Sequence, residues 1–397
     1  MDTSVLLALR DPAGIPFYPI VFQGLYVLTW ALHIAFVLLS LGSMGLSLYG
    51  TTRQASDANW KRLTPHLIQT GKLSVSLLIV LGVAPLLFTQ VIYDPNWYVT
   101  NTLSGMWIFI FIYALIVGYS MYYWYYYANK AKEGGGVLIG AISFALLVFC
   151  GILMHSFSVT SIMPNDWTSM YASGGNIDMS GWTFNMDIIR LAFMVSLALP
   201  VVGIFLQAYG KFVGTRSNMK GEYADFTASL GTKLATVGLL ISAVLFVLWM
   251  FTIGYLFHPI SLASIVGAVI LLALAGLNKN AYITVGWLVV VALLFSTVRE
   301  WIRYDIMAEL GYTIYDYPVN LEIPTIAMFL STFLIMGGVG VAYLLTMAWK
   351  VGKSEGLFDG SKDVAVTKLG DYTLWIMSAW LVIFFGWGLF TLFGNIL

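Results

Sequence analysis

Ten apolar segments dominate the sequence, and each approaches the roughly 20 residues that a helix needs to cross the hydrocarbon core of a bilayer. The apolar runs are continuous, without the alternation typical of a strand. Because unpaired backbone groups are costly in lipid, each run is predicted to be a helix. The sequence therefore predicts an all-α, polytopic membrane helix bundle with about ten transmembrane helices, near residues 20–50, 67–93, 104–128, 136–162, 186–210, 227–257, 259–277, 281–303, 323–349 and 371–395. The sixth and seventh helices could merge, or be kinked at His258-Pro259.

Composition supports the same class of protein. Hydrophobic residues make up 59% of the 397 residues and charged residues only 10%, whereas about a quarter of the residues of a soluble domain are charged. The net charge is zero and no basic cluster is present, which argues against a nucleic-acid partner. The single Cys150 excludes a disulfide within the chain and a metal cluster held by cysteines alone.

Charged residues in the connecting segments alternate in sign along the chain. The loops after the odd-numbered helices hold most of the lysines and arginines, whereas those after the even-numbered helices are acidic. Because basic loops stay in the cytoplasm, this alternation predicts that both termini lie outside. The basic loops contain Arg53, Lys61 and Arg62; Lys130 and Lys132; Lys211, Arg216 and Lys220; Lys279; and Lys350, Lys353, Lys362 and Lys368.

Histidines are few, and three of the four fall towards the predicted outer side. His33 lies inside the first apolar run, His155 near the end of the fourth helix and His258 at the end of the sixth. An ionisable side chain within a membrane helix is a functional-site hypothesis by default. His155 and His258 have a simpler interpretation as interfacial residues, and an isolated His33 could be a hydrogen-bonded packing residue.

The eighth helix ends in a charged segment that contains Arg299, Glu300, Arg303 and Asp305. These charges could form an interfacial ion pair with their side chains reaching towards water. In the functional interpretation, Glu300 is an axial ligand or a proton-handling group. Arg303 would then pair with the propionates of a haem through its two-pronged guanidinium.

Several short motifs together resemble subunit I of the cytochrome bd-type quinol oxidases, over roughly residues 25 to 350. In that family a histidine of the first helix ligates a haem, and a glutamate and an arginine share a signature with the spacing found here. The residues that carry the resemblance are His33-Ile34-Ala35-Phe36-Val37-Leu38-Leu39-Ser40-Leu41-Gly42, Gly71-Lys72, Leu81-Gly82-Val83-Ala84, Asn96-Trp97 with Gly105, Ile152-Leu153-Met154 with Ser156 and Pro164, and Glu300-Trp301-Ile302-Arg303.

The resemblance implies a bundle of the first nine helices over residues 1–350, followed at 351–397 by a cytoplasmic loop and an additional tenth helix. It implies one or two b-type haems, with His33 and Glu300 as candidate axial ligands of the iron. Arg303, His155 and His258 are further candidates for binding the cofactor. The expected location is the cytoplasmic membrane of a prokaryote, and the expected partners are lipid, other membrane subunits and a c-type cytochrome or another external redox protein.

The chain departs from the family pattern at the sites of quinol oxidation and oxygen reduction. The histidine expected on the fifth helix falls near Phe193, and the seventh helix has no methionine. The long hydrophilic quinol loop is absent, and the expected acids of the third helix fall near Leu115 and Tyr123. The sequence thus favours a haem-binding electron-transfer subunit that has lost its quinol-side haem.

Two alternatives stay open. In a divergent terminal oxidase for quinol or cytochrome c, His155 or His258 would replace the missing ligands. In a cofactor-free transporter or membrane anchor, His33 would be a packing residue. No catalytic residue can be assigned from the sequence.

Overall fold

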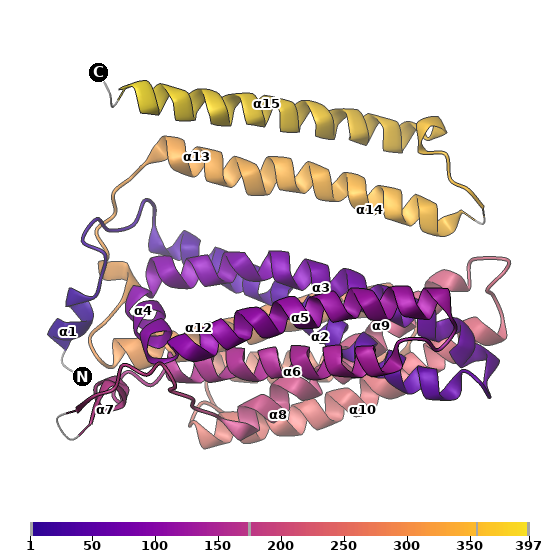
Figure 1. The fold of residues 1–397 in the computed structure, drawn as a ribbon, viewed down its shortest axis with the longest axis horizontal. Helices are drawn as coiled ribbons and strands as arrows, with labels where there is room; N and C mark the ends of the chain where they lie inside the picture. Colours follow the sequence, from indigo (N-terminus) through magenta and orange to yellow (C-terminus); the bar gives the residue numbers. More distant parts are fainter. Residues whose placement is uncertain (1–2, 174–175, 355, 395–397) are drawn as a thin grey trace. The chain divides into compact units, whose positions relative to one another are not determined.

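The computed structural model describes residues 3–173, 176–354 and 356–394 and is almost entirely helical (Figure 1). Within these ranges, ten helical spans are long and apolar enough to cross a membrane, which confirms the predicted all-α polytopic class. Eight spans are single helices: α2 (Pro19–Arg53), α3 (Ala58–Ile92), α5 (Gly105–Ala131), α6 (Val137–Thr160), α10 (Glu222–Thr252), α11 (Pro259–Leu277), α12 (Ala281–Ala308) and α15 (Val364–Gly394).

Two spans are interrupted. The fifth consists of α8 (Ile188–Ser196) and α9 (Ala198–Val213), and the ninth consists of α13 (Ile323–Ser331), the π-helical turn η2 (Thr332–Gly337) and α14 (Gly338–Lys353). The short elements are α1 (Thr3–Ala8), α4 (Asp94–Leu103), α7 (Trp167–Tyr171), the 3-10 turns η1 (Ile314–Asp316) and η3 (Gly360–Lys362), and the antiparallel pair β1 (Ala172–Ser173) and β2 (Asn176–Ile177).

Proline explains two of these boundaries. The fifth span is interrupted at Leu197, three residues before Pro200, where the proline ring removes an amide donor and crowds the preceding turn. The sixth and seventh spans are separate helices, because α10 ends at Thr252 and α11 begins at Pro259. His258 is the N-cap residue of α11, and its Nδ1 accepts a hydrogen bond from the backbone N–H of Ile260 at 3.4 Å.

Contacts between residues divide the chain into two compact units. Unit 1 comprises Met1–Gly14, Tyr18–Val213 and Gly221–Pro318, and unit 2 comprises Ile15–Phe17, Gly214–Lys220 and Val319–Leu397. The ninth span therefore groups with the tenth, and the division at residue 350 expected from the sequence stays a prediction. In unit 2, α14 packs along α15, and an ion pair of 2.8 Å joins Lys350 to Asp363.

In unit 1, successive helices pair as antiparallel neighbours: α2 with α3, α5 with α6, α9 with α10 and α11 with α12. The short helices α1, α4 and α7 gather at one end of this bundle, on the left in Figure 1. We call it the α4 end. The acidic loops of the chain lie there, so the charge pattern predicts that it faces outward.

Glycines allow α9 and α10 to approach closely. A Cβ added to Gly203 would lie 2.4 Å from the backbone nitrogen of Ala235, and one added to Gly231 would lie 2.6 Å from that of Gln207. Small residues at such contacts let helix backbones pack tightly where lipid gives little hydrophobic drive for association.

Aromatic side chains fill the interior of unit 1 between α2, α8, α10 and α12. Phe193 lies at the centre, with its ring centroid 5.1 Å from Phe295, 5.3 Å from Phe246 and 5.8 Å from Trp249. Trp30 adds an edge-to-face contact with Phe295 at 5.5 Å. The position where the resemblance expects a haem-ligating histidine is therefore occupied by a buried phenylalanine packed among other rings.

Candidate functional site

The charged end of α12 is buried rather than interfacial. Residues three and four positions apart lie on one face of a helix, so Arg299, Glu300 and Arg303 project towards the same region of the bundle. Glu300 is 3% exposed and Arg303 is 4% exposed. Because burying an ionised group is costly without compensating contacts, these residues need partners from other helices.

Glu300 joins three helices at the α4 end. Its Oε1 accepts hydrogen bonds from Nε2 of Gln23 on α2, at 2.9 Å, and from the hydroxyl of Tyr93, which directly follows α3, at 2.7 Å. The side-chain oxygen of Gln23 in turn accepts from the hydroxyl of Tyr315 at 2.8 Å. The second oxygen of Glu300 lies 3.9 Å from a guanidinium nitrogen of Arg303 and has no hydrogen-bond donor.

Tyr26 holds the two arginines of α12. Its hydroxyl accepts from Arg303, at 2.7 Å, and from Arg299. The guanidinium of Arg299 lies 4.5 Å from the ring centroid of Trp30, and that of Arg303 lies 5.2 Å from the ring of Tyr93. Cation–π contacts of this kind compensate part of the desolvation of a buried cation.

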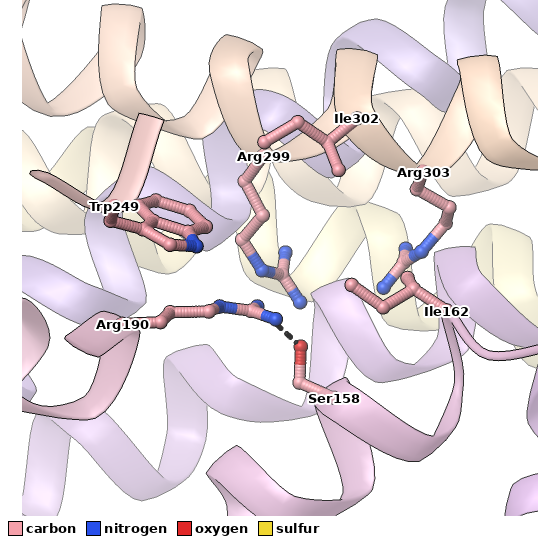
Figure 2. A pocket seen from close by; sticks show the side chains of 7 residues that line it. All are labelled: Ser158, Ile162, Arg190, Trp249, Arg299, Ile302 and Arg303. Atoms are coloured by element: carbon pink, nitrogen blue, oxygen red, sulfur yellow. Dashed lines mark hydrogen bonds between the residues drawn. The ribbon is translucent and has the colours of Figure 1, made fainter. Parts of the chain in front are cut away.

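A third arginine enters the same region from α8. The carboxylate of Asp187 caps this helix by accepting from the backbone N–H of Arg190 at 2.9 Å. The Arg190 side chain is 6% exposed, donates to the hydroxyl of Ser158 at 2.7 Å and lies 5.4 Å from the ring of Trp249. Figure 2 shows the guanidiniums of Arg190, Arg299 and Arg303 directed towards one another.

Two cavities adjoin these arginines. The smaller, of about 10 Å³, is lined by Ser158, Ile162, Arg190, Trp249, Arg299, Ile302 and Arg303 (Figure 2). The larger, of about 330 Å³, shares Ile162, Arg190, Trp249 and Ile302 with it and also reaches Asp187, Tyr255 and Glu309. His33 and Glu300 line neither of these two cavities.

His33 lies between α2 and α3, on the same face of α2 as Gln23, Tyr26 and Trp30. Its Nδ1 is 2.8 Å from the backbone carbonyl oxygen of Leu78. A Cβ added to Gly82 would lie 2.8 Å from Cε1 of the imidazole, so this glycine makes room for the ring. A proton on Nδ1, donated to Leu78, presents Nε2 as the basic nitrogen, the arrangement common in metal-ligating histidines.

His155 and His258 lie apart from Glu300. His155 is buried, and its Nε2 accepts from the backbone N–H of Asp187 at 3.3 Å, so it supports the start of α8. The ring of His258 packs 5.2 Å from Trp301, which is 41% exposed, whereas the neighbouring Glu300 faces inward. The structure thus shows a local role for each of these two histidines, whereas His33 shares a face of α2 with Gln23, which bonds to Glu300.

A second buried polar cluster lies beside the first at the α4 end. Asp94 is 2% exposed, accepts from the hydroxyl of Tyr317 and accepts from the backbone N–H of Asp11 at 2.7 Å. Burial raises the pKa of this carboxyl above its usual value. Arg10 lies over the rings of Tyr312 and Tyr317, at 4.2 and 4.7 Å, and ties the N-terminal segment to this cluster.

Asn96, which the sequence resemblance singled out, fixes the position of α4. It is fully buried, and its Nδ2 donates to the backbone oxygen of Ser161 at 2.6 Å and contacts Sδ of Met307 at 3.5 Å. Its role in this structure is to join α4 to the end of α6 and to α12.

Sequence reasoning identified His33, Glu300 and Arg303 but missed the residues that surround Glu300. Gln23, Tyr26, Tyr93 and Arg190 were not singled out as site residues. A signal was present for α2, because Gln23, Tyr26, Trp30 and His33 recur at helical spacing and mark one polar and aromatic face.

Three side chains offer the atom types that bind a haem, although His33 and Glu300 line neither cavity. An imidazole with a basic Nε2, a buried carboxylate oxygen without a donor and an arginine with a buried, unpartnered Nε are available at His33, Glu300 and Arg303. Across the described residues no three His, Cys, Asp or Glu side chains gather into a metal site. A haem iron needs one or two protein ligands and does not depend on such a cluster.

Fold and site together define an all-α, multi-pass membrane protein with a buried polar site at one end of its bundle. No protein-family model matches the chain, and no curated protein matches it.

Proposed function

We propose that the chain is a haem-binding membrane subunit of a respiratory electron-transfer complex, similar to subunit I of the cytochrome bd-type oxidases but without its quinol-side haem. The observation that carries this proposal is a set of polar groups on α2 and α12. His33 is half-buried and held through Nδ1 by the Leu78 carbonyl, and Glu300 is 3% exposed with one oxygen that has no hydrogen-bond donor.

A b-type haem bound there would supply one-electron redox chemistry, with a potential set by its axial ligands and burial. The protein's own contribution is orientation. The carbonyl of Leu78 fixes the imidazole of His33, and Gln23 and Tyr93 fix the carboxylate of Glu300. Arg303 would pair with a haem carboxylate through its unused Nε.

The aromatic cluster around Phe193 supports the absence of a second haem at that position. Filled by Phe246, Trp249 and Phe295, this part of the bundle holds close-packed rings instead of a ligand. Electrons would then pass between the remaining haem and an external redox protein, such as a c-type cytochrome, at the α4 end. Other membrane subunits and a prokaryotic cytoplasmic membrane belong to the same proposal.

Optical spectroscopy of the purified protein tests this function. We expect a Soret band, a b-type pyridine haemochromogen spectrum and loss of haem in His33→Ala. His66→Ala is the matched control. His66 lies near the start of α3, away from the part of α3 that contacts His33, and its ring packs 5.6 Å from that of Tyr209. Wild-type protein that is folded, was expressed with ample haem and yet contains none would overturn the proposal and favour a cofactor-free transporter or anchor.

A further inference from the structure

The buried cations at the α4 end outnumber the acids beside them. Arg190, Arg299 and Arg303 line one cavity of about 10 Å³, and the buried Glu300 lies 3.9 Å from Arg303. Asp187 adds a second carboxylate nearby, but it is partly exposed and bonds to a backbone N–H. No ion pair within 4 Å joins it to Arg190 in the described part of the chain. Within the described residues, neither Arg190 nor Arg299 therefore has a carboxylate within 4 Å.

Unused donors point to the missing partner. Two guanidinium nitrogens are fully buried and have no hydrogen-bond acceptor: one terminal nitrogen of Arg190 and Nε of Arg303. Their side chains are 6% and 4% exposed. A buried, unpaired donor on a charged group costs several times the free energy of an ordinary hydrogen bond, so an acceptor with negative charge is strongly favoured here.

The size of the cavity restricts the anion. A volume of about 10 Å³ is close to that of a single water-sized probe, and the lining combines three guanidiniums and the Ser158 hydroxyl with apolar side chains. Figure 2 shows the arginine side chains converging on this space from α8 and α12. A monatomic anion fits this description better than a phosphate or an organic acid.

We propose that Arg190, Arg299, Arg303 and Ser158 form a buried binding site for a halide ion. The anion enters from the adjoining cavity of about 330 Å³, which shares Ile162, Arg190, Trp249 and Ile302 with the small one. Bound there, it neutralises the excess charge and lets α8 pack against α6 and α12. The site shares Arg303 with the proposed haem site, but its lining includes neither His33 nor Glu300.

Bromide is the probe of choice, since it is monatomic and scatters anomalously. The full-length protein in detergent is titrated with sodium bromide against sodium gluconate at constant ionic strength, and the melting temperature is followed. Wild type should show a saturable rise with bromide, because a ligand of the folded state stabilises it by mass action. Crystals grown in bromide should give an anomalous peak between Arg190 and Arg299.

Three variants sharpen the test. Arg190→Gln removes the cation and should abolish the bromide-dependent rise, and Arg190→Lys keeps the charge and should retain the rise with an affinity reduced by about ten-fold or more. Arg53→Gln is the matched control, because Arg53 is exposed at the other end of α2 and should leave the response unchanged.

The halide site would be overturned if the melting temperature of wild type showed no saturable difference between bromide and gluconate, or if Arg190→Gln kept the bromide-dependent rise. An anomalous peak found only elsewhere in the crystal would also overturn it. If haem carboxylates occupy these guanidiniums instead, bromide will stabilise only haem-depleted protein, and that result also counts against the proposal. Haem content measured on the same samples keeps this outcome distinct from a failure of the proposed function.

Discussion

The hydroxyl of Tyr93 donates a hydrogen bond of 2.7 Å to Glu300 across 207 residues of sequence. Removing it in Tyr93→Phe leaves the buried carboxylate with one donor to Oε1 instead of two. We expect a loss of about 1–3 kcal/mol in stability, measured as a lower melting temperature in detergent. Tyr98→Phe is the control, because Tyr98 is 51% exposed and should melt like wild type. Equal stability of the two variants would show that the Tyr93 bond contributes nothing.

Glu300→Gln tests whether the carboxylate is charged. The amide retains the shape and an acceptor for Gln23 and Tyr93 but removes the negative charge beside Arg303. Breaking a buried ion pair by removing one partner typically costs about 3–5 kcal/mol, so this variant should be less stable than Tyr93→Phe. A melting temperature unchanged from wild type would mean that Glu300 is already neutral in the folded protein.

Much of the fold could be predicted from local sequence. The ten apolar runs and the proline at residue 259 lie within single segments, and each has one physical interpretation. The interruption at Leu197 was missed, although Pro200 was visible, because a proline in a membrane helix can be accommodated without a break. The grouping of the ninth span with the tenth depends on packing, which local periodicity does not report.

Only part of the candidate site could be predicted: the ionisable residues, but not the side chains that surround Glu300. His33 and Glu300 are conspicuous because ionisable groups are costly in apolar helices. The partners of Glu300 are ordinary interfacial residue types, and Gln23 and Tyr93 reach it over sequence separations of 277 and 207 residues. The expectation that the charges of α12 could be a water-facing ion pair was wrong for Glu300 and Arg303, because these residues are 3% and 4% exposed and bond to Gln23, Tyr93 and Tyr26.

Gly82 provides a way to move His33 without replacing it. In Gly82→Ala the new methyl group would lie 2.8 Å from Cε1 of the imidazole, so the ring must shift from the Leu78 carbonyl. Under the proposed function, haem content should fall, measured as the ratio of Soret absorbance to protein absorbance. Gly151→Ala is the matched control, since no atom lies within 4 Å of its added Cβ. Full haem occupancy in Gly82→Ala would show that His33 does not need its present position to bind the cofactor.

Two glycine-to-alanine changes should have opposite effects, one at the contact between α9 and α10 and one on an open face of α12. In Gly203→Ala the added Cβ would lie 2.4 Å from the backbone nitrogen of Ala235, so the helices must separate. Overpacking of this kind costs about 1–3 kcal/mol. Gly286→Ala meets no atom within 4 Å and should be stabilised by up to about 1 kcal/mol through helix propensity. Thermal melting of both variants checks the signs, and a Gly203→Ala protein as stable as wild type would contradict the close approach.

Asp94 predicts a pH dependence of stability at the α4 end. Because burial raises its pKa, the folded protein binds this proton more tightly than the unfolded chain does. The contribution of Asp94 to stability is therefore fully present when the pH is below the pKa of Asp94 in the unfolded chain. This contribution is lost as the pH rises through the pKa of Asp94 in the folded protein. Asp94→Asn has no such proton, so the melting temperature of wild type minus that of the variant should fall as pH rises from about 4 to about 6.

The exposed Asp178 supplies the control for this pH effect. Hydrogen bonds from Ser180 lower the pKa of Asp178, so its contribution to stability is present above the unfolded pKa and is lost only as pH falls. The difference between wild type and Asp178→Asn should therefore not decrease over the same range. If the Asp94 difference instead stays constant or grows between these pH values, Tyr317 and the Asp11 amide stabilise the carboxylate more than burial destabilises it. That result would make Asp94 an ionised anchor for the N-terminal segment.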